Sequence, residues 1–536
     1  MEAAIGGSFA LIIAPLGITA LLGFALIFLI WKSGRSYDCW KKRGVPYVKP
    51  YPFFGSVLEN LGRRIHEVEN DRYKKYGAVY GHFEGTSPFL SVADPELVRS
   101  VLVKDFHIFS NRRELTTGDV ITESMLQLLQ GENWKRVRTI VSPTFSTGKI
   151  KRMMSIFSSC SKVLVDNYSK FAEKGEPVDV KKIFGAFSMD VIANSAFSTK
   201  IDSHNDPNNA FVTAARPFFQ NTVPWRLALW LVFPSIVKLF KIKVASPLST
   251  KFFADVTLNI IKERKRTGQT RNDFLQLLIE AADEQKAEEK VAEKGDNILN
   301  NYEGETNEEV FKNFKPKKTL SSDELVAQCV IFFLAGFETT ASALSFACYY
   351  LALNPDIQDK LFKELDETIR AENGELTYES LQGMKYLDNV ISETLRINPP
   401  AIRLERVAST DYKLGNTGIT VPKKTCITIP VYAIHRDPKF YPEPLKFDPD
   451  RFLPEERAKR NPYTFMPFGS GPRNCVAMRF ALVEVKVCLV YVLSHFRIKA
   501  CPQTKVPLEY RKGSGLLQPL DVTLLMELRE NIPLKN

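Results

Sequence analysis

A long apolar stretch near the middle of the chain constrains the fold more than any other feature. Ser321 and Glu324 form the pattern of a capped helix N-terminus, and Pro355 should end the helix. The predicted helix has about 30 residues and a length of about 45 Å at 1.5 Å per residue. Its centre, 330–350, is apolar on nearly all sides. Such a helix must be surrounded by other elements, so it should cross the middle of the protein.

The same predicted helix carries residues that do not suit a protein core. Gln328, Glu338 and Thr339 interrupt the apolar run, so a membrane-spanning helix is not expected here. Gly336 weakens a helix interior, and hydroxyl side chains compete with its backbone hydrogen bonds. These residues predict a local break in the helix, of a kind common at functional sites. The alternative is a bent core helix whose polar groups are all satisfied.

The composition of the chain is that of a globular protein. Of its 536 residues, 44% are hydrophobic and 25% are charged. These values exclude a disordered chain, a collagen-like fibre, a small disulfide scaffold and a polytopic membrane protein. The eight cysteines are dispersed without a C-x-x-C pair, so zinc and dithiol chemistry are not expected. The net charge of +11 predicts an anionic neighbour. Because the basic clusters are short and isolated, that neighbour is not expected to be nucleic acid.

The N-terminal region has the pattern of a membrane anchor. Residues 8–31 carry no charge, and this run is long enough for a helix to span a bilayer. Basic residues follow the apolar run, so the body should lie on the cytoplasmic side. A cleaved signal peptide is the alternative, but its apolar region would be shorter and its positive charge would come first. We therefore expect an anchor over 1–31, a basic and proline-rich hinge over 32–55, and one domain over 56–536.

A glycine-rich loop near the C-terminus contains the residue with the clearest chemical signal. Cys475 follows Gly469, Gly471 and Arg473 and precedes an apolar helical run over 476–493. A helix N-terminus and a neighbouring arginine both lower a thiol pKa. No other cysteine or histidine lies near Cys475 in the sequence, so a single-thiolate metal site indicates haem. A buried cysteine after an ordinary loop is the alternative, and this loop alone leaves both open.

Five segments, in order, resemble the motifs of the cytochrome P-450 superfamily, and the likeness runs from about residue 35 to the end. The loop Phe468-x-x-Gly-x-Arg-x-Cys475 resembles the superfamily's cysteine-ligand loop. The other four segments resemble its propionate helix, oxygen-activating helix, Glu-x-x-Arg pair and meander: Trp134-x-x-x-Arg138, Ala335–Thr340, Glu393-x-x-Arg396 and Phe447–Phe452. The chain also looks similar to the animal family 3 members that oxidise drugs and steroids. Ala477 is a departure, because the family pattern usually has glycine there.

The resemblance implies a mainly α fold with small β-sheets, in which a single domain binds haem b. It implies that Cys475 is the axial ligand of the haem iron. The propionates would be held by one aromatic and four basic side chains, which are Trp134, Arg112, Arg138, Arg406 and Arg473. Arg113 and Arg403 are expected to be solvated or structural. A buried ion network supporting the haem loop is expected from Glu393, Arg396 and Arg451.

The resemblance also implies catalytic and substrate-binding positions. Thr339 would assist oxygen activation through a hydrogen bond, and Glu338 would supply protons. Five apolar residues match pocket positions of the family: Leu334, Ala335, Ala401, Ile402 and Leu516. Residues 120–125 and Leu517 are further candidates. For an apolar stretch over 211–233 two alternatives are open: core aromatics, or a roof over the pocket that dips into the membrane.

The predicted activity is that of a monooxygenase that inserts one atom of O₂ into lipophilic xenobiotics, steroids or other lipids. By resemblance, electrons would come from NADPH through a flavoprotein reductase, with cytochrome b5 as a second donor. The protein would face the cytoplasm from the endoplasmic reticulum membrane, and Lys135 and Arg136 would meet the acidic reductase. The alternatives are a haem-thiolate isomerase or dehydratase, and a haem carrier or sensor. The Glu338–Thr339 pair argues against both, because neither needs a proton relay. The sequence does not name the substrate.

Overall fold

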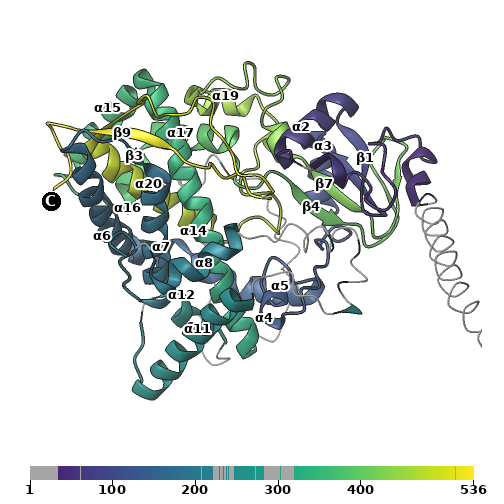
Figure 1. Cartoon of the computed structure of the whole chain (residues 1–536), viewed down its shortest axis with the longest axis horizontal. Helices are drawn as coiled ribbons and strands as arrows, with labels where there is room; N and C mark the ends of the chain where they lie inside the picture. The colour runs from purple at the N-terminus through teal and green to yellow at the C-terminus, as the bar shows by residue number, and fades with distance from the viewer. Residues whose placement is uncertain are drawn as a thin grey trace, which may run out of the picture.

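The computed structural model describes most of the chain. The described residues are 34, 36–60, 62–206, 208–220, 229, 233, 237, 239–240, 247–271, 273–282, 302, 319–513 and 515–535. The predicted anchor over 1–31 lies outside them. Most helices gather on one side of the molecule, and the largest sheet lies on the other (Figure 1).

The described part of the chain is mainly helical, as the resemblance implied. Its α-helices are α2 (Ile65–Tyr76), α3 (Pro95–Arg99), α4 (Val120–Glu123), α5 (Gly131–Val141), α6 (Thr147–Ala172), α7 (Val180–Phe197), α8 (Ala210–Gln220), α11 (Pro247–Thr267), α12 (Phe274–Ala282), α14 (Ser322–Leu353), α15 (Pro355–Ala371), α16 (Tyr378–Gly383), α17 (Lys385–Ile397), α18 (Val431–Ile434), α19 (Pro454–Ala458) and α20 (Met478–His495). Short turns of tighter or wider helix are η1 (Val57–Asn60), η2 (Ser100–Lys104), η3 (Ser142–Phe145), η5 (Pro449–Phe452) and η6 (Pro462–Thr464).

Three small sheets complete the fold. The largest has the strand order β1-β2-β7-β4, formed by β1 (Val79–Glu84), β2 (Ser87–Val92), β7 (Cys426–Ile429) and β4 (Leu404–Val407). β1 and β2 form a hairpin around Gly85, which has a positive φ of 59°. The second sheet pairs β3 (Val178–Asp179), β9 (Thr523–Leu528) and β8 (Phe496–Lys499), and the third pairs β5 (Tyr412–Lys413) with β6 (Thr420–Val421).

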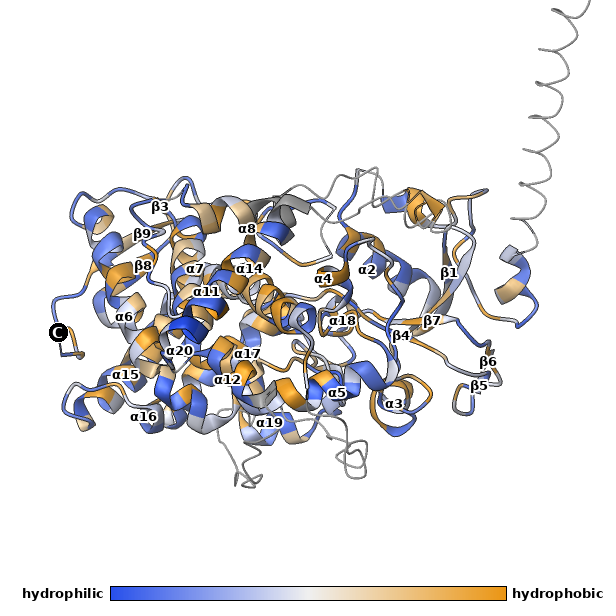
Figure 2. Ribbon diagram, turned by 90° about the horizontal axis from the view of Figure 1, so that it is seen from below, coloured by the Kyte–Doolittle hydropathy of each residue, from blue (hydrophilic) through white to orange (hydrophobic). Residues whose placement is uncertain are grey.

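Helix α14 confirms the predicted central helix. It begins after Ser321, whose hydroxyl accepts a hydrogen bond from the Glu324 N–H at 3.1 Å, and it ends at Asn354. It runs among the other helices and carries many apolar residues (Figure 2). Of the described helices, α14 is the one long and apolar enough to cross a membrane, but most of it is buried in the protein.

The predicted break in this helix is wrong. The backbone stays helical through Gly336 and Thr339, from one end of α14 to the other. Gly336 instead serves close packing, because a Cβ there would lie 2.5 Å from Ile192 Cδ1 of α7. A larger residue at position 336 would therefore force the Ile192 side chain to shift between α7 and α14.

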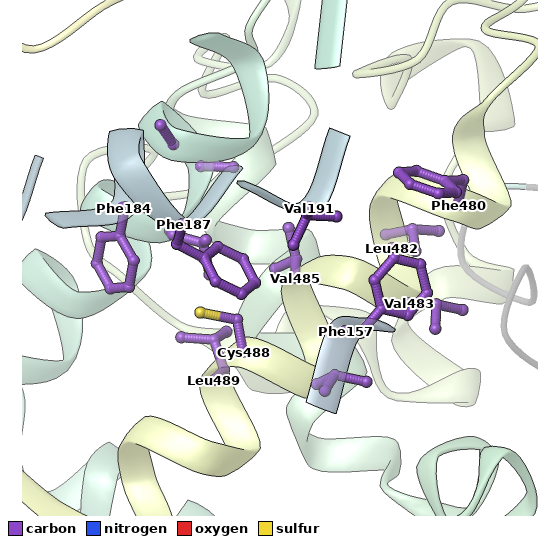
Figure 3. Packing of buried hydrophobic residues seen from close by; sticks show 14 of the residues in the cluster. Phe157, Phe184, Phe187, Val191, Phe480, Leu482, Val483, Val485, Cys488 and Leu489 are labelled. Carbon is purple, nitrogen blue, oxygen red and sulfur yellow. The ribbon is translucent and has the colours of Figure 1, made fainter. Parts of the chain in front are cut away.

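The core positions the helix that follows Cys475. Phe157 of α6 packs edge-on against Phe480 of α20, with ring centroids 5.1 Å apart. Phe184 and Phe187 of α7 lie close to Cys488 and Leu489 of α20 in the same cluster (Figure 3). Because α20 is packed this tightly on α6 and α7, the start of α20 has a fixed position relative to α14.

We expect Gly336→Ala to destabilise the protein, although alanine favours helices. The clash with Ile192 should cost about 1–3 kcal/mol of unfolding free energy, which exceeds the helix propensity gained. Denaturant unfolding measures this loss, and Gly336→Ala combined with Ile192→Ala should recover part of it. A Gly336→Ala variant as stable as the parent would show that α7 can move away from α14.

Candidate functional site

The loop before α20 has a backbone that few sequences can adopt. Gly471 has a φ of 73°, and a Cβ there would lie 2.1 Å from the carbonyl oxygen of Leu102. The Cys475 N–H donates to the Phe468 carbonyl at 2.9 Å, which closes the loop. By contrast, Ala477 has a φ of −98°, so the methyl group that departs from the family pattern is tolerated. The loop therefore presents Cys475 just before α20 begins.

The environment of Cys475 differs from the sequence-based expectation. Its side chain keeps solvent-accessible surface although protein atoms surround it, as expected of a residue that lines an interior opening. Burial raises the pKa of the Cys475 thiol, and this outweighs the Ala477 N–H and the charges of Arg138 and Arg112, which lower it. The prediction of a lowered thiol pKa is thus wrong for the protein alone. A thiolate at this position needs a bound cation to offset the cost of burial.

Four arginines gather beside this loop without a matching acid. Arg112, Arg138, Arg406 and Arg473 come from separate segments of the chain, and the Arg112 Nη2 atom lies 3.4 Å from the Arg473 carbonyl oxygen. Within the described residues, no carboxylate forms an ion pair with any of the four. Buried nitrogen atoms are left without a hydrogen-bond partner on three of them: Arg112 Nε, Arg406 Nε, and Arg473 Nε and Nη1.

The electrostatics of these side chains indicate a site for an anion. Burial, followed by repulsion from Arg112, Arg406 and Arg138, lowers the pKa of Arg473 to about 8. Burial and the charge of Arg112 lower the pKa of Arg406 to about 9. Cations whose burial is this unfavourable are usually paired with anions in proteins. The two carboxylates of a haem group supply such anions, so the unpaired N–H groups fit this cofactor.

Trp134 and Arg138 lie on one face of α5 but make different contacts. The Arg473 guanidinium lies over the Trp134 ring, 4.2 Å from its centroid. Arg138 donates to both oxygens of Asn474, at 2.9 Å to the backbone carbonyl and 2.8 Å to the side chain. Arg138 therefore holds the loop next to Cys475, and its guanidinium is more fully satisfied than those of Arg406 and Arg473.

The structure brings Glu393, Arg396 and Arg451 together. The Glu393 carboxylate accepts from Arg396 Nε at 2.6 Å and Nη2 at 2.8 Å, and both side chains are fully buried. Arg451 Nε lies 3.5 Å from Glu393 Oε1, and the Asp448 N–H donates to the same oxygen at 3.0 Å. Arg396 also donates to the carbonyl of His435 at 2.7 Å. These contacts tie α17 to the segment ahead of the cysteine loop.

Arg113 and Arg403 belong to a second ion network, so of the two roles expected for them the structural one is observed. Both pair with Glu84 and with Glu405, and Arg403 also pairs with Glu69 at 2.9 Å. The network joins α2, β1 and β4. Each of its two guanidinium groups contacts at least two carboxylates, so the network leaves no unpaired cation for an anionic ligand to neutralise.

Thr339 and Glu338 point to different neighbours, because consecutive helical residues lie about 100° apart around the axis. The Thr339 hydroxyl donates to the Ala335 carbonyl one turn earlier, at 2.7 Å. Glu338 forms an ion pair with Lys181 of α7, which also donates to the Ser342 hydroxyl at 3.0 Å. No local sequence pattern pointed to Lys181, because it lies 157 residues from Glu338.

The expected substrate contacts fall into two groups. Ala401 and Leu516 are neighbours in a β-bridge, and the Leu517 N–H donates to the Pro400 carbonyl at 2.9 Å. On α14, Leu334 is buried whereas Ala335 is exposed. Ile402 is buried in the core. Of the aromatic residues expected over 211–233, Phe211 packs on Phe333 of α14 and is a core residue, Phe233 is partly buried, and the other four side chains lie outside the described residues.

One of the two predicted docking residues has partners within the chain. Arg136 pairs with Glu324 and donates to the Thr319 carbonyl at 2.6 Å, so it fastens α5 to the start of α14. Only 18% of its side chain is exposed. Lys135 pairs with Glu132 at 3.0 Å and stays closer to the surface.

Two polar residues that sequence reasoning left without a role support the site. Gln328 of α14 accepts from the Leu126 N–H at 3.1 Å and donates to the Ser124 carbonyl at 2.8 Å, which holds the loop after α4. An amide in an otherwise apolar helix was the signal that could have revealed it. His435 Nε2 accepts from the Met466 N–H at 2.8 Å, just ahead of the cysteine loop.

Comparison with known proteins agrees with this geometry. The family model described as Cytochrome P450 matches residues 45–526. Cytochrome P450 3A29 of Sus scrofa is 39% identical over 506 residues, which cover 93% of this chain and 94% of that protein. Cytochrome P450 3A5 of Homo sapiens is 39% identical over 507 residues, with the same coverage of both chains. The chain therefore belongs to the cytochrome P450 family and is a haem-dependent monooxygenase.

Replacing one arginine of the cluster should separate haem binding from folding. We expect Arg406→Met to weaken haem binding by roughly 10- to 100-fold, since a hydrogen bond to a charged group contributes about 1.5–3 kcal/mol. The apoprotein should be no less stable, because a buried cation without an anion has been removed. Haem titration and unfolding of the apoprotein measure the two effects. Arg266→Met, at an exposed site, is the control, and unchanged haem affinity in Arg406→Met would contradict the anion site.

Removal of the Glu393 side chain should lower the stability of the folded protein. Glu393→Ala leaves Arg396 buried without its carboxylate, and we expect a loss of about 3–5 kcal/mol and little haem-bound protein. The yield of folded protein and its haem content measure this loss. Glu456→Ala breaks an exposed pair with Lys459 and should cost about 1 kcal/mol or less. Normal haem content in Glu393→Ala would refute the supporting role of the network.

Proposed function

We propose that this monooxygenase inserts one atom of O₂ into a lipophilic substrate and reduces the other atom to water. The substrate class is xenobiotics, steroids or other lipids, and NADPH supplies electrons through a flavoprotein reductase. The observation that carries the proposal is the cluster of buried arginines with unpaired N–H groups beside Cys475. Such a cluster favours a dianionic cofactor, and the nearby cysteine favours an iron-bearing one.

The chain's own residues have distinct proposed roles around haem b. Haem, when bound, supplies the iron at which O₂ is activated. Cys475 would hold the iron through its thiolate, which would donate electron density to it. Arg112, Arg406 and Arg473 would donate their unpaired N–H groups to the propionates. Supporting roles fall to Trp134, which stacks on Arg473, and to Arg138, which orients Asn474.

Proton delivery is proposed for the central helix. Thr339 lies one turn after the exposed Ala335, and its hydroxyl donates to the Ala335 carbonyl. The same hydroxyl could donate to another acceptor beside the helix instead. Glu338 supplies the protons that oxygen reduction consumes. Apolar surface for the substrate is proposed from Leu334, Ala335, Ala401, Ile402 and Leu516. Glu393, Arg396 and Arg451 are proposed to support the cysteine loop and to take no part in the chemistry.

The proposed location is the cytoplasmic face of the endoplasmic reticulum membrane. The uncharged run over 8–31 is followed by basic residues, which favours a single anchor with the body in the cytoplasm. An acidic reductase, with cytochrome b5 as a second donor, would complement the net charge of +11. Of the two docking residues expected, Lys135 remains a candidate.

Product analysis distinguishes this proposal from its alternatives. The holoenzyme, reconstituted with reductase and NADPH, should convert lipophilic compounds to products that carry one oxygen atom from ¹⁸O₂. Conversion without NADPH would instead identify an isomerase or dehydratase. Haem binding without conversion of any compound that displaces the iron-bound water would identify a carrier or sensor.

Thr339→Ala should uncouple electron use from product formation. Loss of the hydroxyl impairs proton delivery, so we expect product per NADPH to fall roughly tenfold or more while hydrogen peroxide is released. NADPH oxidation, peroxide and product are measured together. Thr339→Ser keeps a hydroxyl and should retain most of the coupling. Full coupling in Thr339→Ala would remove Thr339 from the proposed mechanism.

A further inference from the structure

A tyrosine from a polar stretch of sequence packs against the loop that leads to Cys475. Residues 283–310 carry many charged and amide side chains, and Tyr302 is the only aromatic residue among them. The Tyr302 ring lies edge-on to the Phe468 ring, with centroids 5.3 Å apart, and 5.7 Å from the centroid of the Phe465 ring. Both separations fall in the range of about 4.5–7 Å at which aromatic pairs attract each other. Tyr302 therefore contacts two aromatic residues that lie shortly before the cysteine.

The hydroxyl group of Tyr302 reaches a second element. It lies 3.0 Å from the hydroxyl of Ser392 on α17, a residue that is fully buried. Ser392 also donates to the Asp388 carbonyl one turn earlier, at 2.7 Å. Burial raises the pKa of Tyr302, so its hydroxyl stays neutral in this position. The side chain of Tyr302 thus fills the space between α17 and the loop.

Phe468 connects this contact to Cys475. The Phe468 carbonyl accepts the hydrogen bond from the Cys475 N–H at 2.9 Å. Phe465 has a further aromatic neighbour, because the His435 ring stacks on it with centroids 5.5 Å apart. Among the described residues, the ring of Phe468 makes its aromatic contact with Tyr302 alone. The residue that is bonded to the cysteine backbone is therefore the one that depends most on Tyr302.

We propose that Tyr302 is a positioning residue for the thiolate of Cys475 and that it acts through Phe468. This rests on the role proposed above for Cys475 as the ligand of the haem iron. The Tyr302 ring fixes Phe468, and with it the carbonyl that binds the Cys475 N–H, and it excludes water from this side of the loop. Hydrogen bonds and solvent near a ligating sulfur change the reduction potential of the metal. The segment between α12 and α14 thus contributes one side chain to the support of the cysteine loop.

Tyr302→Ala tests this role in the full-length holoenzyme. Because Phe468 then lacks its aromatic contact, we expect the red-shifted Soret band of the reduced carbon monoxide complex to be lost roughly tenfold faster. The haem reduction potential should shift to more positive values, since water can then donate hydrogen bonds to the sulfur. Tyr302→Phe keeps the ring and should behave as the parent enzyme in both measurements.

Tyr37→Ala is the matched control. Tyr37 is also partly buried, and its ring lies edge-on to that of Phe83 at 5.1 Å, in contact with the large sheet. This variant should leave the lifetime of the band and the reduction potential as in the parent enzyme. Equal changes in Tyr37→Ala and Tyr302→Ala would show a general loss of stability and would overturn the proposal.

The remaining results also decide the matter. A band that lasts as long in Tyr302→Ala as in the parent, at an unchanged potential, would overturn the positioning role. Equal losses in Tyr302→Ala and Tyr302→Phe would overturn it too, because the hydroxyl and not the ring would then be responsible. If Tyr302→Ala fails to bind haem, Tyr302→Leu, which retains apolar volume without a ring, decides by the same two measurements. A parent enzyme without the red-shifted band would instead contradict the role of Cys475 itself, and this inference with it.

Discussion

Positive charge buried without a protein counter-ion is the constraint on which this structure depends. Arg112, Arg406 and Arg473 bring cations to the Cys475 loop. Burial lowers the pKa of each, and repulsion from neighbouring arginines adds to this shift for Arg406 and Arg473. For these side chains to gather, α5, β4 and the start of α20 must meet at one point, although α5 lies hundreds of residues before the other two. That convergence requires a single large body instead of the several domains that the length alone suggests. A cofactor with two carboxylates turns the repulsion into attraction.

The two other ion networks show what a purely structural arrangement looks like. In both, every arginine contacts a carboxylate: Arg396 contacts Glu393 behind the cysteine loop, and Arg113 and Arg403 contact Glu84 at the edge of the large sheet. A network whose cations are paired in this way contributes to a defined fold and has no use for an anionic ligand. The contrast within one molecule makes the unbalanced arginine cluster informative, because the same fold satisfies its charges elsewhere.

Much of the fold could be predicted from local patterns in the sequence. The capping residues and apolar run of α14, the hairpin around Gly85 and the glycine turn ahead of Cys475 depend on neighbours in the chain. Predictions from the sequence missed the features that depend on contacts with a distant segment of the chain. Gly336 serves packing against Ile192 and does not break the helix. Arg136 forms an ion pair with Glu324, which lies 188 residues away in the sequence. Burial also reverses the shift in thiol pKa that the residues around Cys475 suggest.

Spectroscopy of the reduced carbon monoxide complex tests the central claim most directly, namely that Cys475 and the arginine cluster together hold a thiolate-ligated haem. The complex of the full chain should show the strongly red-shifted Soret band that a thiolate ligand produces. Cys475→His, which replaces the thiolate by an imidazole, should bind haem in the same arginine cluster but show the band of a nitrogen-ligated iron. A red-shifted band that persists in Cys475→His would contradict the assignment.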